Sequence, residues 1–183
     1  MIGDVLAILY AVVQLLVPSL PPAPLSSTAL LTNDKYLGKW YFVGVASWDT
    51  DDIQGYQGID NSMAELKKTA DGSLEMTATM LKGDQCLTMS WTYKVDASMD
   101  PIMEEGDNIG MAFDGKWIDC DSCMLILKIH PEETFIRIML FARTQDARGE
   151  LVEKFKTKME SYWVIDQFVI PPQTKEMKSD FQC

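Results

Sequence analysis

Residues 73–95 alternate polar and apolar side chains, and this pattern constrains the fold more than any other feature of the chain. The apolar positions are Leu74, Met76, Ala78 and Met80, followed by Leu87, Met89, Trp91, Tyr93 and Val95. A period of two over this length is typical of antiparallel strands that bury one face. Lys82-Gly83-Asp84 supplies a turn between the two runs, so this stretch predicts two consecutive strands of a meander.

Strand-like sequence extends from Gly38 to Lys94, and further strands are predicted after residue 108. Those after residue 108 are predicted at 108–113, 116–120, 123–129 and 134–142, with a last short strand at 168–170. The chain therefore predicts an all-β fold, an eight-stranded up-and-down antiparallel barrel, followed by a C-terminal α-helix and a short final strand. Closing such a sheet into a barrel removes its exposed edges.

The helix is predicted over 147–163, where the apolar period changes from two to about 3.6. Its apolar stripe is Leu151, Phe155, Met159 and Tyr162. Asp146 can cap the first turn, and Glu150 and Lys154 can form an ion pair one turn apart.

The first 29 residues differ in composition from the rest of the chain. Residues 5–17 read VLAILYAVVQLLV, with Gln14 as the one polar residue. That run is short for a membrane span and has the length of a signal-peptide apolar region. We predict a signal peptide over 1–29, with its retention as an anchor as the alternative, and one domain over 30–183 that is secreted and extracellular.

The net charge of the chain is −11, which disfavours nucleic acid as a partner because the phosphates would repel it. We expect a monomer that carries no cofactor and no metal. A zinc site in the Cys120–Cys123 region would need two further ligands, and His130 is the one histidine of the chain. We predict instead a disulfide between Cys120 and Cys123 across a hairpin turn at Asp121-Ser122, with free thiols as the alternative.

Three features together resemble the lipocalin family: Gly38-Lys39-Trp40 at the first strand, Arg143 at the end of the eighth, and the helix that follows. The resemblance implies that Trp40 fills the closed end of the barrel, with Arg143 over its indole as a cation–π contact. Gly38 would let the backbone approach closely there. The resemblance also favours a disulfide between Cys86 and Cys183, which would attach the carboxyl tail to the fourth strand.

Within the lipocalins the chain is most similar to the apolipoprotein M group and next to the orosomucoid (alpha-1-acid glycoprotein) group. The segments that carry the likeness are LGKWYFVGVA at 37–46, YQGIDN at 56–61, TATMLKGDQCLTMSWTY at 77–93 and FIRIMLFART at 135–144. Lysolipid-binding members hold the ligand phosphate with two arginines, which fall on Met89 and Met111, whereas the tryptophan of that site matches Trp91. A neutral or carboxylate-bearing lipid needs those arginines less than sphingosine-1-phosphate does.

The ligand-binding residues are predicted from strand alternation. If Trp40 points inward, Phe42, Gly44, Ala46 and Trp48 share its face. The full predicted set is Phe42, Met76, Met80, Met89, Trp91, Met111, Phe113, Arg137, Met139 and Phe141. For each methionine, ordinary core filling is the alternative to ligand contact. Arg137 would need an anion inside the barrel, either a ligand carboxylate or phosphate or an internal salt bridge, unless the strand faces the other way.

These features predict a secreted carrier of a small lipophilic molecule: a fatty acid, a retinoid or a lysolipid such as sphingosine-1-phosphate. The resemblance adds lipoprotein particles or a cell-surface receptor as partners. The alternative is an orosomucoid-like scavenger of drugs, toxins or organometals. A lipocalin-type isomerase is the minor alternative, because that enzyme needs a reactive cysteine in the barrel and Cys86 is expected to be bonded. We therefore predict that the protein is not an enzyme.

Overall fold

The structure, a computed structural model, describes residues 23–95, 102–104, 109–129, 136–145, 148–161, 167–175 and 177. The described strands are β1 (Gly38–Ser47), β2 (Ile59–Lys68), β3 (Leu74–Lys82), β4 (Gln85–Lys94), β5 (Ile102–Glu104), β6 (Ile109–Asp114), β7 (Cys123–Ile129), β8 (Ile136–Ala142) and β9 (Phe168–Val169). The described helices are α2 (Ser27–Thr32), α3 (Thr50–Gln54), the 3₁₀ helix η1 (Gly115–Ile118) and α4 (Arg148–Glu160). Within the described ranges, no helix has the length and apolar character needed to cross a membrane.

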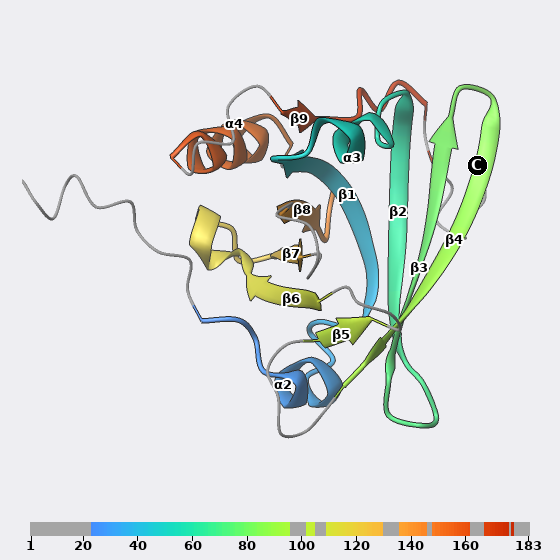
Figure 1. Cartoon of the computed structure of the whole chain (residues 1–183), viewed down its shortest axis with the longest axis vertical. Coiled ribbons are helices and arrows are strands. Elements are labelled where there is room, and N and C mark those ends of the chain that lie inside the picture. The colour runs from blue at the N-terminus through green and yellow to red at the C-terminus, as the bar shows by residue number, and fades with distance from the viewer. Residues whose placement is uncertain are drawn as a thin grey trace, which may run out of the picture.

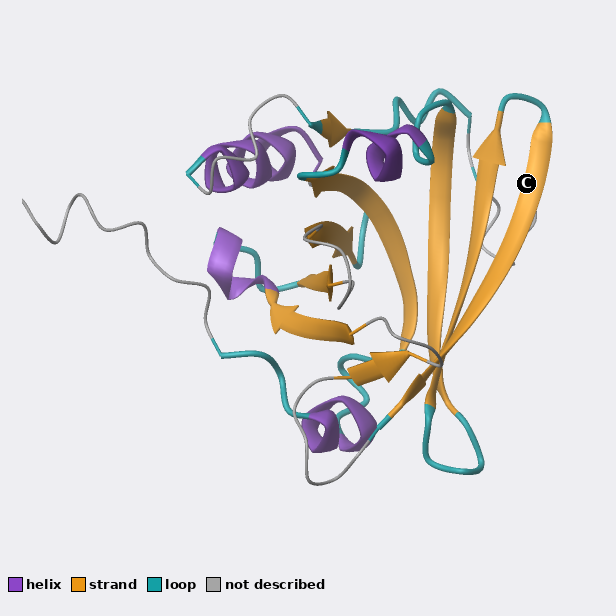
Figure 2. Ribbon diagram, viewed as in Figure 1, coloured by secondary structure: helices purple, strands orange, loops and turns teal. Residues whose placement is uncertain are grey.

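The described strands form one antiparallel sheet in the order β2-β3-β4-β5-β6-β7-β8-β1-β9. β1 joins the two sides of this sheet, because Gly38–Tyr41 pairs with β2 and Tyr41–Ser47 pairs with β8. Figures 1 and 2 show the sheet curled into a half-barrel, with α4 outside it near β9. The predicted antiparallel up-and-down sheet with a C-terminal helix and a short final strand is confirmed.

Two strands differ from the prediction. The stretch 116–120, expected as a strand, is the 3₁₀ helix η1 and a turn. The Asp114 side chain caps this helix by accepting a hydrogen bond from the Lys116 amide at 3.0 Å, so the backbone turns away from the sheet. The short strand β5 takes the place of the missing strand, and it was not predicted because residues 102–104 are too few to show alternation.

A disulfide between Cys120 and Cys123 closes the turn after η1, with Cα atoms 5.5 Å apart. The predicted bond is confirmed, although the turn joins a 3₁₀ helix to β7 and is not a hairpin. Cys86 is also disulfide-bonded. Its predicted partner, Cys183, lies outside the described residues, so that pairing stays a prediction.

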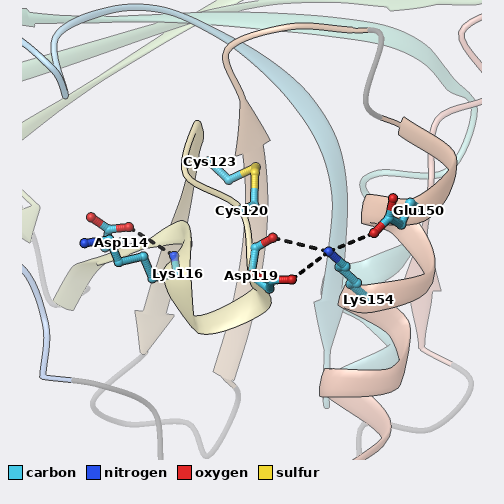
Figure 3. Close-up of a disulfide and its surroundings, with 7 residues drawn as sticks. All are labelled: Asp114, Lys116, Asp119, Cys120, Cys123, Glu150 and Lys154. Carbon is cyan, nitrogen blue, oxygen red and sulfur yellow. Dashed lines mark hydrogen bonds and ion pairs between the residues drawn. A yellow bond between two sulfur atoms is a disulfide. The ribbon is translucent and has the colours of Figure 1, made fainter.

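Helix α4 packs on the outside of the sheet next to this disulfide turn. The Lys154 ammonium lies 3.0 Å from an Asp119 carboxylate oxygen and 2.9 Å from a Glu150 carboxylate oxygen (Figure 3). The predicted Glu150–Lys154 pair is therefore present. The helix runs from Arg148 to Glu160, shorter than predicted, and the expected cap Asp146 and stripe residue Tyr162 lie outside the described residues.

Buried apolar side chains form two groups, one on each face of the sheet. The inner core is enclosed by the half-barrel and includes Trp40, Phe42, Val45, Leu66, Leu74, Met76, Tyr93, Ala112, Met139 and Phe141. The helix-side core lies between the sheet and α4 and includes Val43, Ala46, Phe113, Leu125, Leu140, Leu151, Phe155 and Met159. Alternation along each strand divides its residues between these two cores.

A register shift in β1 between Phe42 and Gly44 changes which residues face inward. Before it, Trp40 and Phe42 belong to the inner core; after it, Val45 is inward and Ala46 belongs to the helix-side core. A Cβ on Gly44 would meet the Ile170 side chain. The expectation that Gly44 and Ala46 face the cavity is therefore wrong, because the bulge inserts one residue into the alternation. Trp48, expected on the same face, is partly exposed at the end of the loop into α3.

Figure 1 shows α2 at the lower end of the half-barrel, and Trp40 packs in the same core as Leu30 of this helix. Trp40 is fully buried, and its indole nitrogen donates to the Tyr36 carbonyl at 2.9 Å. The Arg143 guanidinium lies 3.6 Å from the centre of the Trp40 ring. Gly38 has a φ of +86°, which explains the glycine at this position better than close backbone approach does.

Candidate functional site

The half-barrel encloses a cavity of about 50 Å³. Its lining is mostly apolar and aromatic: Phe42, Tyr56, Ile59, Ser62, Met76, Ala78, Met80, Trp91, Tyr93, Lys128, Arg137, Met139 and Phe141. Strands β1, β2, β3, β4, β7 and β8 each contribute at least one of these side chains. Alternation places them inward, and antiparallel register brings pairs such as Met76 and Trp91 side by side.

Arg137 lies in this lining and is paired with Asp52, which comes from α3 at the rim. One Arg137 guanidinium nitrogen donates to the Asp52 carboxylate, and both side chains are less than a fifth exposed. The guanidinium carbon lies 5.4 Å from the centre of the Tyr56 ring. Arg137 therefore has the predicted inward orientation, and an internal carboxylate already neutralises much of its charge.

A second cation, Lys128 on β7, lines the same cavity and was not predicted. It is only 5% exposed and stands directly opposite Arg137 in the β7–β8 register. Its ammonium lies 5.3 Å from the Trp91 ring centre and 5.4 Å from the Tyr93 ring centre. The signal was present in the sequence, because Lys128 has the same strand parity as the inner-core residues Met124 and Ile126.

Seven of the ten predicted ligand-binding residues are brought together around the cavity. They are Phe42, Met76, Met80, Trp91, Arg137, Met139 and Phe141. Whether they bind a ligand stays a prediction. Tyr56 and Ser62 join them in the lining, and sequence reasoning missed them because a loop position and a small polar side chain give no clear pattern. Ile59, Ala78 and Tyr93 also line the cavity, and the alternation that carries Met76 and Trp91 could have found Ala78 and Tyr93.

The other three predicted residues lie elsewhere. Met89 is 49% exposed. Phe113 packs in the helix-side core, with its ring 6.3 Å from that of Trp117. Met111 contacts the helix-side core and borders a small void of about 20 Å³ near the closed end. The expectation that Phe113 faces the cavity is wrong, because on β6 the inward position is that of Ala112.

A larger hollow of about 570 Å³ is more open to solvent and lies between residues 57–60, Gly83 and residues 168–175. The charged side chains around it already form hydrogen bonds and an ion pair within the chain. Asp60 accepts hydrogen bonds from Thr174 and Lys175, and the Lys175 ammonium lies 2.9 Å from Asp84. We therefore interpret this hollow as a structural junction and take the enclosed cavity as the candidate site. No group of side chains suited to hold a metal ion occurs among the described residues.

A family model matches most of this chain, and curated relatives match it at less than 30% identity. The ApoM domain model matches residues 26–179. A protein named lipocalin from Rhinella marina is 28% identical over 153 residues, covering 81% of this chain and 84% of its own. Prostaglandin-H2 D-isomerase from Equus caballus is 27% identical over 151 residues, covering 78% of each chain.

Solved structures show the same fold at low identity. The solution structure of lipocalin 12 from rat epididymis superposes with a TM-score of 0.67 at 15% identity, covering 91% of this chain and 99% of that one. The siderocalin Ex-FABP, described as functioning through dual ligand specificities, superposes with a TM-score of 0.62 at 18% identity and covers 77% of this chain and 96% of its own.

Proposed function

Because this chain belongs to the ApoM domain family of lipocalins, we propose that it carries a single-chain lipid with one acidic headgroup, with the headgroup and the adjoining part of the chain held in the cavity of its half-barrel. A lipocalin of this family binds a lipophilic ligand, and a fatty acid is our first candidate for its identity. A retinoid that carries a carboxylate, or a lysolipid, also has an apolar body and an anionic end.

One observation supports an acidic headgroup: two cations, Lys128 and Arg137, line an otherwise apolar cavity. Two neighbouring positive charges in an apolar site are costly unless anions lie near them. Asp52 supplies one anion for Arg137. A ligand carboxylate in the cavity would be attracted by both cations, and charge-assisted hydrogen bonds to a carboxylate are stronger than neutral ones.

A carboxylate fits better than a phosphate. The resemblance to lysolipid-binding lipocalins implies that the two arginines that hold their ligand phosphate fall here on Met89 and Met111. Met89 is half-exposed, and Met111 contacts the helix-side core. Neither position offers a charge to a dianionic group inside the cavity, so sphingosine-1-phosphate is the less favoured lysolipid.

We extend the proposal to a secreted carrier that associates with lipoprotein particles. The apolar run at 5–17 supports secretion, and the Cys120–Cys123 disulfide is typical of oxidising compartments. Lipoprotein association rests on the family alone and would use a retained leader.

Isomerase activity is the second candidate function, because several curated relatives are named prostaglandin-H2 D-isomerase. Such an enzyme would need a reactive thiol in the barrel. The described lining of the cavity carries the hydroxyls of Tyr56, Ser62 and Tyr93 and no thiol, and Cys86, Cys120 and Cys123 are bonded. Incubation with prostaglandin H2 tests this function directly, and turnover would replace the carrier proposal.

Titration with palmitic acid and with hexadecanol at pH 8 tests the carrier proposal. We expect the acid to bind at least tenfold more tightly than the alcohol, since hydrogen bonds to charged groups contribute about 1.5–3 kcal/mol. Lys128→Met should remove most of this preference and leave alcohol binding within about threefold. Lys68→Met, an exposed lysine on β2, serves as the matched control.

A second pair of variants tests the place of binding. Ala78→Phe puts a ring into the cavity, whereas Thr77→Phe puts it on the other face of β3. We expect the first variant to lose both ligands and the second to keep them. Equal binding by the two variants, or no binding by the wild-type protein, would contradict the proposal.

A further inference from the structure

The inner face of β4 continues beyond the enclosed cavity. Trp91 and Tyr93 line the cavity, and Leu87 and Met89 have the same strand parity. In the β3–β4 register, Met89 stands opposite Ala78 and Leu87 opposite Met80, both of which line the cavity. Directly opposed residues of an antiparallel pair share one face, so Leu87 and Met89 extend the apolar wall of the cavity.

These two side chains are not covered as the rest of that wall is. Leu87 is 40% exposed and Met89 is 49% exposed, and together with Trp48 they are the large apolar side chains most exposed in the described chain. The pairing of β4 with its neighbours explains why Leu87 and Met89 are exposed. Beyond β3, the described pairings of β4 involve Tyr93 and Lys94 alone, which pair with β5. Figure 1 shows β5 beside only the lower end of β4.

The enclosed cavity is small for a lipid. Its volume is about 50 Å³, whereas ligand pockets usually measure roughly 300–1,000 Å³. A long alkyl chain that entered this cavity would have to extend beyond it. The apolar path from Met80 to Leu87 and Met89 is the continuation that the inner face of the sheet offers.

We propose that Leu87 and Met89 form a lateral extension of the binding site, which holds the distal part of a long, unbranched alkyl chain. This inference rests on the proposed function and adds the ligand class: chains too long for the enclosed cavity. The headgroup end would lie near Lys128 and Arg137, and the far end would leave the half-barrel along β4. Methionine suits such a contact because its unbranched side chain adapts to a mobile ligand.

A chain-length series of saturated fatty acids from C8 to C18 tests the extension. In the wild-type protein, affinity should rise by about fourfold for each methylene that the extension buries. Met89→Glu and Leu87→Glu should each weaken C16 and C18 binding by about tenfold or more while C8 binding changes less than twofold. Thr88→Glu, on the opposite face of the same strand, should leave the whole series unchanged.

The outcomes separate this inference from the proposed function. If no fatty acid of any length binds, the proposed function fails. If C8 binds and the gain with length is the same in Met89→Glu as in the wild-type protein, only the extension is wrong. The alternative is that a second copy of the chain covers Leu87 and Met89, and sedimentation velocity of the ligand-free protein tests it. A dimer that Met89→Glu converts to a monomer would assign this surface to a second copy and overturn the inference.

Discussion

Arg143 shows how one side chain fixes the closed end of the half-barrel. Its guanidinium stacks on Trp40 and also donates to the carbonyls of Lys35, Leu37 and Lys39. Burial lowers the pKa of this guanidinium from its ordinary value. The planar fork of arginine can stack and donate in several directions at once, which a lysine ammonium cannot do.

We expect Arg143→Ala to lower the free energy of unfolding by about 2–4 kcal/mol, because it removes a cation–π contact and leaves three carbonyls without their charged donor. Urea denaturation followed by tryptophan fluorescence measures this. Arg143→Lys should recover less than half of the loss. Full recovery by lysine would show that charge alone matters and that the stacked geometry does not.

At the scale of elements, α2 is part of the fold even though it spans the predicted end of the leader. The Ser26 side chain caps the helix by accepting from the Ala29 amide at 3.1 Å. The Leu25 amide donates to the Ala112 carbonyl of β6 at 2.7 Å. Leu30 is fully buried in the inner core. Cleavage after residue 29 would remove the cap and the bond to β6, whereas a retained leader would keep both.

Substitutions in α2 test its contribution to stability. Leu30→Ala should cost about 2–5 kcal/mol, as large-to-small changes in a core do. Ser26→Ala should cost about 1 kcal/mol through the lost cap. Thr28→Ala, at an exposed position of the same helix, should change stability by less than about 0.5 kcal/mol. A negligible effect of Leu30→Ala would show that α2 does not close the barrel in solution.

At the scale of the whole molecule, two carboxylates join distant parts of the chain. Asp114 on β6 accepts hydrogen bonds from Lys35 and Tyr36 before β1, and Asp60 accepts from Thr174 and Lys175 near the carboxyl end. Partial burial acts to raise the pKa of each carboxyl, but the hydrogen bonds and the neighbouring lysine outweigh it. The pKa of both groups is therefore lowered from its ordinary value.

Stability should therefore fall in acid. Because the folded pKa lies below the unfolded one, each carboxylate contributes stability that is fully present above the unfolded value of about 4. That contribution is lost as pH falls through the folded pKa. We expect urea midpoints to be constant from pH 7 to about pH 5 and to drop below about pH 4. The double variant Asp60→Asn/Asp114→Asn should be less stable at pH 7 and show a smaller drop; an unchanged drop would contradict this account.

Sequence alone determined the parts of the fold that depend on neighbouring residues. Alternation located β3 and β4, the change of period located α4, and the Glu150–Lys154 pair follows from helix geometry. The Cys120–Cys123 disulfide could be predicted because a tight turn brings residues three apart within bonding reach. Most of the cavity lining followed from parity on strands that keep regular alternation.

Tertiary structure decided what depends on register and on contacts between distant segments. The bulge in β1 reversed the orientation of Ala46, and the capping of η1 by Asp114 replaced an expected strand. The pairing of Arg137 with Asp52 and the position of Lys128 beside Trp91 join residues far apart in the sequence. No local pattern encodes such contacts, because a one-residue shift turns every following side chain to the other face of the sheet.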